Sequence, residues 1–152
     1  MTERRECREN EIRIRLASLK DADIVARHDN HISEALIRDK ISREEIIVAY
    51  DGNTFIGWLR YSLFWDIVPF MNMLLIQPEY RGKGIGRQLA QFWEALMRKQ
   101  GHKKLMTSTQ QNEHAQHFYL ALGYVAVGGF IQTSGSLTDE SFEIILVKEL
   151  SL

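Results

Sequence analysis

The chain has 152 residues, of which 45% are hydrophobic and 26% charged, and its formal net charge is −1 at pH 7. These values are typical of one soluble globular domain, and a nearly neutral chain without a basic stripe gives no reason to expect nucleic-acid binding. The single cysteine, Cys7, excludes an intramolecular disulfide, and no apolar run is long enough for a signal peptide or a membrane helix, so we expect a cytoplasmic protein without a membrane partner.

The first half of the chain predicts two helices and three strands behind a polar leader. Residues 1–10 form the leader, and we expect residues 11–152 to form a single domain. Ser18 and Asp21 form a Ser-x-x-Asp signal for the start of a helix, and the residues 51–53 form a hairpin turn. The predicted elements are a strand at Ile12–Leu16, a helix from about Ser18 to His28, a helix at about Ser33–Ile41, and strands at Ile46–Tyr50 and Thr54–Phe64.

The second half predicts four strands and two helices. Phe70–Gln77 is apolar on both faces, as expected of a buried central strand. The elements after it are a helix from Ile85 to near Gly101, a strand at Leu105–Thr109, a helix beginning at Asn112, and strands at Tyr124–Ile131 and Phe142–Leu150. The whole order, β-α-α-β-β-β-α-β-α-β-β, predicts an α/β (α+β) fold with a mixed central sheet flanked by helices.

The loop after the apolar strand carries the clearest functional signal. Between Gln77 and Leu89 the sequence reads Gln-Pro-Glu-Tyr-Arg-Gly-Lys-Gly-Ile-Gly-Arg-Gln-Leu, so three glycines alternate with cations in front of a helix. Glycine lets the backbone approach a ligand closely, and a helix N-terminus offers unpaired N–H groups and positive potential. The loop therefore predicts a phosphate or pyrophosphate site. Its glycine spacing fits neither the Walker A motif nor the Gly-x-Gly-x-x-Gly dinucleotide fingerprint.

A second motif lies at residues 112–124, Asn-Glu-His-Ala-Gln-His-Phe-Tyr-Leu-Ala-Leu-Gly-Tyr. One apolar helix face is formed by the residues at i, i+3, i+4 and i+7, which are Ala115, Phe118, Tyr119 and Leu122. Asn112 suits the N-cap of this helix and Gly123 its C-cap.

The two motifs together resemble the GNAT superfamily of N-acetyltransferases. Residues 81–86, Arg-Gly-Lys-Gly-Ile-Gly, are similar to the acyl-CoA loop signature Arg/Gln-x-x-Gly-x-Gly/Ala, and residues 112–124 are similar to the element Asn-x-x-Ala-x-x-Phe-Tyr-x-x-x-Gly-Phe/Tyr. The resemblance covers nearly the whole chain. It implies the GNAT fold, acetyl-CoA (coenzyme A) as acyl donor without a metal, and direct acetyl transfer to a primary amine.

The resemblance also implies a role for each motif residue. Tyr119 would be the general acid, with its hydroxyl near the thioester sulfur, and Asn112 would contact CoA. Backbone N–H groups near Leu74, Leu75 and Ile76 would hold the pantetheine arm and polarise the thioester carbonyl. The residues implied to bind the pyrophosphate are Arg81, Gly82, Lys83, Gly84, Ile85, Gly86 and Arg87.

The general base stays unassigned. Many relatives carry a Glu on the central strand, whereas alignment on Pro78 puts Asn72 and Met73 there; Asn72 could hold a relaying water but cannot take a proton itself. The other candidates are Asp66, the nearest carboxylate in sequence, and Glu34 and His31 in the region that usually lines the acceptor site. For each of these three, the favoured interpretation is an exposed loop or helix residue without a catalytic role. The histidine pairs His28/His31 and His114/His117 lack the further ligands that zinc requires, so no metal site is predicted.

Two functions fit the sequence. One is an acetyl-CoA-dependent N-acetyltransferase acting on an unidentified small-molecule or peptide amine; the other is a non-catalytic acyl-CoA-binding sensor or regulatory module with the GNAT fold. Tyr119 favours the enzyme, because a pure binder needs no hydroxyl beside the sulfur, and the missing Glu keeps the alternative open.

Phe64 and Trp65 are candidates for lining an acceptor pocket, and acids such as Asp66 would favour a cationic acceptor. The acceptor and the oligomeric state stay open, although dimers are frequent in the family.

Overall fold

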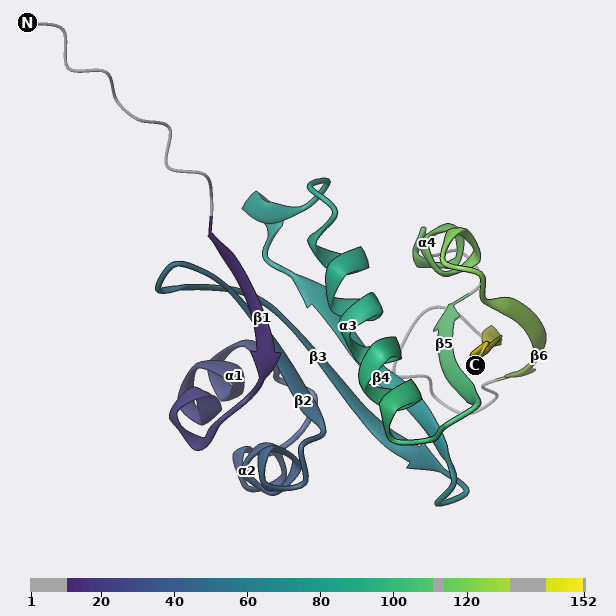
Figure 1. Ribbon diagram of the computed structural model, residues 1–152, viewed down its shortest axis with the longest axis horizontal. Helices are drawn as coiled ribbons and strands as arrows, with labels where there is room; N and C mark the ends of the chain where they lie inside the picture. Colours follow the sequence, from purple (N-terminus) through teal and green to yellow (C-terminus); the bar gives the residue numbers. More distant parts are fainter. Residues whose placement is uncertain (1–10, 111–113, 132–141, 152) are drawn as a thin grey trace, which may run out of the picture. The chain divides into compact units, whose positions relative to one another are not determined.

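A computed structural model of the chain describes residues 11–110, 114–131 and 142–151. In these residues the strands form a seven-stranded sheet with the order β1-β2-β3-β4-β5-β7-β6, accompanied by four α-helices (Figure 1). The sheet is mixed, because β4 and β5 are parallel whereas the β1–β2, β5–β7 and β6–β7 pairs are antiparallel. The predicted α/β (α+β) class and the predicted order of elements are confirmed. No helix in the described part of the chain is long and apolar enough to cross a membrane.

The chain divides into two compact units, Met1–Trp58 with Leu75–Leu89, and Leu59–Leu74 with Ala90–Leu152. In the first, β1 (Ile12–Leu16) pairs with β2 (Ile46–Asp51), and the helices α1 (Ala22–His28) and α2 (Glu34–Ser42) lie side by side next to these strands (Figure 1). Ser33 caps α2 by accepting from the Leu36 N–H at 3.1 Å. The helix α1 follows directly on a 3-10 turn, Leu19–Asp21, where Asp21 accepts from the Ser18 N–H at 2.8 Å.

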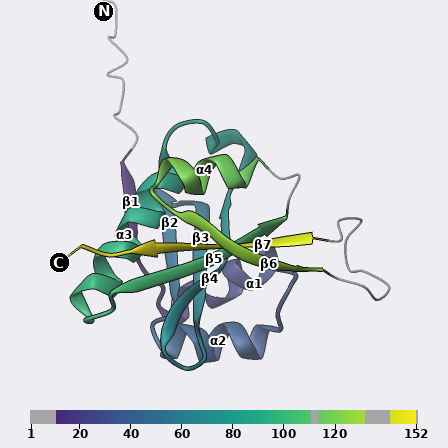
Figure 2. The same ribbon diagram turned by 90° about the vertical axis from the view of Figure 1, so that its right-hand side faces the viewer.

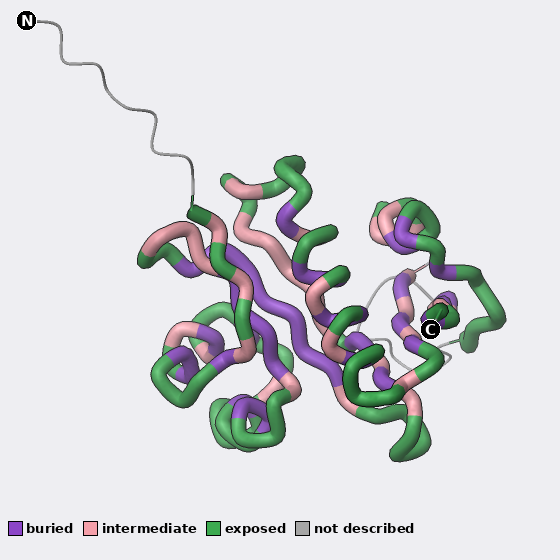
Figure 3. Tube along the Cα trace, viewed as in Figure 1, coloured by how far each residue is buried: buried purple, intermediate pink, exposed green. Residues whose placement is uncertain are grey.

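The most deeply buried stretch of backbone runs along β2 and β3 (Thr54–Phe64), as Figure 3 shows. Ile46–Ala49 are fully buried, and Phe55–Tyr61 are all buried as well. Gly57 sits where β3 meets the end of β4 (Val68–Ile76): a Cβ at this position would lie 2.7 Å from the Ile76 side chain and 2.8 Å from the Leu75 carbonyl oxygen. A glycine is therefore needed for the close approach of these two strands.

In the second unit, β5 (Lys104–Gln110), β7 (Phe142–Glu149) and β6 (Val125–Ile131) run side by side, with β7 in the middle (Figure 2). The helix α4 (Ala115–Ala121) packs against β5. The long helix α3 (Ile85–Lys99) continues from the first unit into the second, where Trp93 is buried with its ring 5.7 Å from that of Tyr61.

The structure corrects one expectation about β4. The strand spans Val68–Ile76 rather than Phe70–Gln77, and it is not buried along its length: Pro69 and Met71 are buried, Asn72 is exposed, and residues 73–76 are half-buried. Apolar side chains that stay accessible on a strand are typical of a ligand-binding surface, and the sequence pattern does not distinguish them from a covered core. The helix α4 also begins at Ala115, later than predicted. Asn112, its predicted cap, lies outside the described residues, as does the leader 1–10.

Candidate functional site

The start of the glycine-rich loop is held by backbone hydrogen bonds. After β4, the Gln77 N–H donates to the Ile56 carbonyl at 2.8 Å, and the Tyr80 N–H donates to the Gln77 carbonyl at 2.9 Å in a single 3-10 turn. The Arg81 Nε–H reaches back to the Ile76 carbonyl at 2.9 Å. The position where the chain leaves the sheet is therefore fixed.

Two glycines then take the left-handed backbone conformation. Gly82 has φ +75° and Gly84 has φ +80°, and a Cβ on either would meet no atom within 4 Å. These glycines are therefore required by the backbone conformation and not by crowding, since an L-residue would lose about 1–2 kcal/mol in this region. The space beside them is open to a ligand.

The loop delivers the chain to the N-terminus of α3. Gly84 is the first acceptor of the helix, because its carbonyl oxygen takes the Gln88 N–H at 3.1 Å. The N–H groups of the first turn, Ile85 to Arg87, have no carbonyl acceptor within the helix. The turn contains no acidic residue, and Arg81, Lys83 and Arg87 are exposed around it, with the Lys83 ammonium 5.3 Å from the Tyr80 ring centre. Oriented N–H groups and three cations are chemically suited to bind an anion.

The predicted residues 81–87 therefore lie together at this loop and the first turn of α3, and they fall into different structural roles. Gly82 and Gly84 set the backbone. Ile85 is 3% exposed, so its N–H group rather than its side chain is available to a ligand. Asn112, the remaining predicted CoA contact, lies outside the described residues.

Backbone directions at the end of β4 separate the three predicted N–H donors. The Gln77 N–H and the Leu75 carbonyl both point to β3, where they meet Ile56 and Gly57. Because backbone groups alternate between the two edges of a strand, those of Leu74 and Ile76 point to the opposite edge, and the Ile76 carbonyl indeed takes Arg81 there. Leu74 and Ile76 are therefore better placed than Leu75 to donate to a ligand.

In the second unit, Tyr119 is held rigidly on α4. The side chain is 7% exposed, and its ring makes edge contacts with Phe118 at 5.2 Å and Tyr124 at 5.6 Å between ring centres. Gly123, at φ +94°, turns the chain back, and the Tyr124 N–H then donates to the Tyr119 carbonyl at 3.0 Å. Gly123 thus ends the helix as predicted, and the exposed His114 and His117 lie off the apolar face.

The Tyr119 hydroxyl is aimed at β4. It donates to the Met71 sulfur at 3.5 Å, a weak acceptor, and the Thr107 hydroxyl donates to the Met71 carbonyl at 3.1 Å. Met71 is paired with Thr107 of β5, and the next residue of β4, Asn72, is exposed and donates to the Ser62 hydroxyl at 2.8 Å. The hydroxyl therefore reaches β4 at the point where the strand becomes accessible.

Glu94 and Lys148 form an ion pair next to Tyr124, a neighbour of Tyr119, and the sequence did not indicate this pair. Glu94 is 4% exposed and accepts from the Lys148 ammonium at 2.6 Å, and this ammonium lies 5.7 Å from the Tyr124 ring centre. Burial, together with the negative charge of Glu94 and the neighbouring Tyr119, raises the pKa of Tyr124, so its phenol stays neutral. Glu94 and Lys148 are 54 positions apart, so no local pattern could have linked them.

Two of the candidate bases, Glu34 and His31, belong to the first unit, and each has a charged neighbour there. Glu34 is exposed and pairs with Arg38 at 3.2 Å on its own helix. His31, whose side chain is 70% exposed, lies 3.5 Å from a carboxylate oxygen of Asp29. Asp29 is itself buried and accepts from the Trp58 indole N–H at 3.2 Å, so it fixes the loop between α1 and α2. Sequence reasoning missed this carboxylate, because nothing near it in the sequence points to Trp58.

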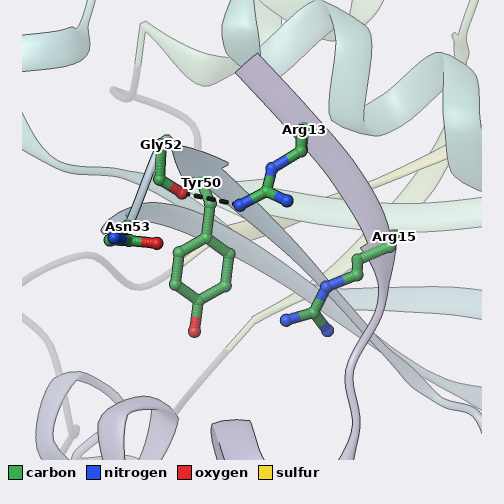
Figure 4. A pocket seen from close by; sticks show the side chains of 5 residues that line it. All are labelled: Arg13, Arg15, Tyr50, Gly52 and Asn53. Carbon is green, nitrogen blue, oxygen red and sulfur yellow. Dashed lines mark hydrogen bonds between the residues drawn. The ribbon is translucent and has the colours of Figure 1, made fainter. Parts of the chain in front are cut away.

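A cavity of about 200 Å³ lies over the β1–β2 pair (Figure 4). It is lined by Arg13, Arg15, Tyr50, Gly52 and Asn53. Its cations are held by partners within the protein: Arg13 donates to the Gly52 carbonyl at 2.9 Å, and Arg15 pairs with Asp21 through contacts of 2.7 and 2.9 Å. The sequence did not predict this cavity. The hydrogen bonds of its two arginines connect parts of the protein and so have a structural role.

Asp21 is the centre of that network. Burial alone would raise its pKa, but hydrogen bonds from Arg15, from the Ser18 N–H and from the Tyr50 hydroxyl outweigh burial and lower the pKa of Asp21 to about 2. Burial and the hydrogen bond to Asp21 raise the pKa of Tyr50 to about 12. The carboxylate is therefore charged throughout the physiological range, and it ties β1, β2 and the start of α1 together.

No group of three His, Cys, Asp or Glu side chains in the described ranges is arranged to hold a metal ion.

Comparison with known proteins identifies the family. The model of the Acetyltransferase (GNAT) family matches residues 13–124. Among solved structures, the chain is similar to Ard1 from Thermoplasma volcanium, with 19% identity, a TM-score of 0.79, and coverage of 93% of this chain and 99% of that one.

Two further similar structures contain the coenzyme. The PaiA N-acetyltransferase from Thermoplasma acidophilum in complex with coenzyme A has 20% identity, a TM-score of 0.69, and coverage of 91% of this chain and 99% of that one. YncA, a putative acetyltransferase from Salmonella typhimurium with its cofactor acetyl-CoA, has 14% identity, a TM-score of 0.78, and coverage of 93% and 95%. A search of curated proteins by sequence gave no match. These likenesses show that the fold is the GNAT fold.

Proposed function

Because the chain belongs to the GNAT acetyltransferase family, we propose that it is an N-acetyltransferase that transfers the acetyl group of acetyl-CoA directly to a primary amine. The observation that carries this proposal is the match over residues 13–124, which includes both the glycine-rich loop and the Tyr119 helix. The neighbours with coenzyme A and acetyl-CoA bound support the choice of donor. We further propose that the protein acts in the cytoplasm; a homodimer stays a prediction.

The anion site at the N-terminus of α3 fits the pyrophosphate of acetyl-CoA. The first-turn N–H groups would each donate to a phosphate oxygen, and Arg81, Lys83 and Arg87 would neutralise the charge of the pyrophosphate. The open space beside Gly82 and Gly84 would allow the pyrophosphate to approach the backbone closely enough for these hydrogen bonds. This part of the chain binds and orients the donor.

For the chemical step, Tyr119 is the general acid that we propose. Attack of the neutral amine on the thioester carbonyl forms the C–N bond and breaks the C–S bond; the nitrogen loses one proton to solvent, and the departing thiolate takes one proton from Tyr119. A phenol with a pKa near 10 can protonate a thiolate whose conjugate acid lies near 8.5 when it is held in place. The rigid packing of the Tyr119 ring and the aim of its hydroxyl at the start of the accessible part of β4 support this role. N–H groups of Leu74 and Ile76 would polarise the thioester carbonyl.

The experiment that tests the proposal is a screen of the purified protein with acetyl-CoA against a panel of primary amines: polyamines, amino sugars, amino acids and peptides with free N-termini. Release of free thiol together with an acetylated amine in the mass spectrum is the expected result. Binding of coenzyme A, measured by calorimetry, without thiol release for any amine would contradict the proposal and support an acyl-CoA sensor.

A further inference from the structure

The turn between β3 and β4 has an unusual backbone for its sequence. Phe64, Trp65, Asp66 and Ile67 form a tight hairpin turn, closed by the Ile67 N–H donating to the Phe64 carbonyl at 3.1 Å. Trp65 has φ +53° and Asp66 has φ +60°. Turns with positive φ at both central residues normally use Asn-Gly, and a bulky residue at positive φ is an outlier. The turn conformation therefore does not explain the presence of Trp65, whereas Asp tolerates positive φ better than most residues.

The same turn exposes an aromatic and aliphatic cluster. Trp65 is 78% exposed, Ile67 69%, Leu63 41% and Phe64 36%. The Phe64 ring lies 4.6 Å from the Trp65 ring and 6.1 Å from the Phe70 ring, so the three rings are contiguous. A contiguous apolar patch on a surface indicates a binding site.

The charge at this cluster suggests what binds. Asp66 is exposed at the turn, and within the described residues no cationic side chain pairs with it. A carboxylate beside aromatic faces attracts ammonium groups, because the ring faces carry negative potential and the carboxylate carries a full negative charge. The cluster thus complements an organic cation and repels an anion.

The position of the cluster links it to the Tyr119 site. All these residues belong to the same compact unit as Tyr119. From Val68 the strand β4 runs roughly 10 Å to Met71, the contact of the Tyr119 hydroxyl. Phe70, which touches Phe64, lies two residues before the exposed Asn72 and so shares its face of the strand, whereas the Met71 side chain that meets the Tyr119 hydroxyl lies on the other face. An extended molecule along the Phe70–Asn72 face could therefore reach the accessible part of β4 from the side opposite the Tyr119 hydroxyl.

We propose that Phe64, Trp65 and Asp66 form a subsite for a second cationic group of the acceptor, remote from the amine that is acetylated. The preferred acceptors are therefore extended amines with at least two ammonium groups, such as polyamines. This inference rests on the proposed acetyltransferase function and specifies its acceptor class.

The test compares two amines that differ only at the remote end of the chain, where one carries a second ammonium group. 1,8-Diaminooctane carries an ammonium group at each end, whereas octylamine carries one, and the kcat and KM for both are measured at saturating acetyl-CoA. The wild type should prefer the diamine. Asp66→Asn should reduce that preference about fivefold, through KM rather than kcat, because a solvent-exposed ion pair contributes up to about 1 kcal/mol. Asparagine tolerates positive φ, so the turn is preserved.

Glu149→Gln provides the matched control, since it removes one negative charge from an exposed residue at the end of β7. Its diamine preference should equal that of the wild type. Equal KM values for the two amines in the wild type, or an unchanged preference in Asp66→Asn, would overturn the subsite. If Trp65→Ser instead abolished self-association and left the preference intact, the cluster would be a contact between copies. Absence of turnover with every amine would contradict the acetyltransferase function itself.

Discussion

Tyr119 is the residue on which the proposed chemistry depends most. Removal of its hydroxyl in Tyr119→Phe should lower kcat about 100-fold, because a positioned general acid contributes typically 10²–10⁴-fold. The KM for acetyl-CoA should change less than twofold, since the ring packing against Phe118 and Tyr124 is kept. Steady-state kinetics of thiol release measures both parameters.

The neighbouring Tyr124 provides the control for that variant. It is also a buried tyrosine, and its hydroxyl has no hydrogen-bond partner in the part of the chain that the structure describes. Tyr124→Phe removes a buried hydroxyl without breaking a hydrogen bond and should leave kcat within twofold. Equal kcat values for wild type and Tyr119→Phe would remove Tyr119 from the mechanism.

Asp21 gives a prediction about pH and stability. Its folded-state pKa of about 2 lies below the ordinary value of 3.8, so the carboxylate stabilises the fold fully above about pH 5, and this contribution is lost as the pH falls toward 2. Asp21→Asn should lower the free energy of unfolding at pH 7 by about 1–2 kcal/mol. The difference from wild type should shrink between pH 5 and pH 2.5, as measured by chemical denaturation.

Asp23→Asn is the control for the stability change expected in Asp21→Asn. Asp23 is 70% exposed and pairs with Arg38 on the surface, so its loss should change stability by less than about 0.5 kcal/mol. A difference between Asp21→Asn and wild type that stayed constant from pH 7 to pH 2.5 would show that the carboxylate charge is not what stabilises the network.

At the scale of elements, we propose that the loop and the start of α3 act as one anion-binding unit. Gly84→Ala places an L-residue at φ +80°, which costs about 1–2 kcal/mol and displaces the first-turn N–H groups. The Kd for coenzyme A should therefore rise about tenfold, as measured by calorimetry. Gly101→Ala strains an equally left-handed glycine, at φ +90° after the other end of α3, and should leave the Kd unchanged. Equal effects of both substitutions would show that the loss comes from general destabilisation.

The elements also show how far the sequence could predict the structure. The bounds of β1 and β3 agree with the predicted strands, because alternation and turn residues are local signals. The glycine-rich loop was predictable for the same reason. The exposure of β4 was not, since an apolar strand has the same pattern whether a protein layer or a ligand covers it.

Contacts between distant residues account for what sequence reasoning missed. The Asp29–Trp58 hydrogen bond joins residues 29 positions apart, and the Tyr50–Asp21 bond also joins residues 29 positions apart. Such pairs depend on the register of strands and the placement of helices, which no single segment specifies. The left-handed backbone conformation of Trp65 could not be predicted either, because bulky residues rarely adopt positive φ.

For the whole molecule, the central claim is transfer of an acetyl group from acetyl-CoA to an amine. The most direct measurement incubates the protein with isotopically labelled acetyl-CoA and the best amine of the panel, and quantifies thiol and labelled amide together. We predict one labelled amide for each thiol released, at a rate that Tyr119→Phe reduces about 100-fold. Tight binding of acetyl-CoA with no labelled amide from any amine would contradict the account.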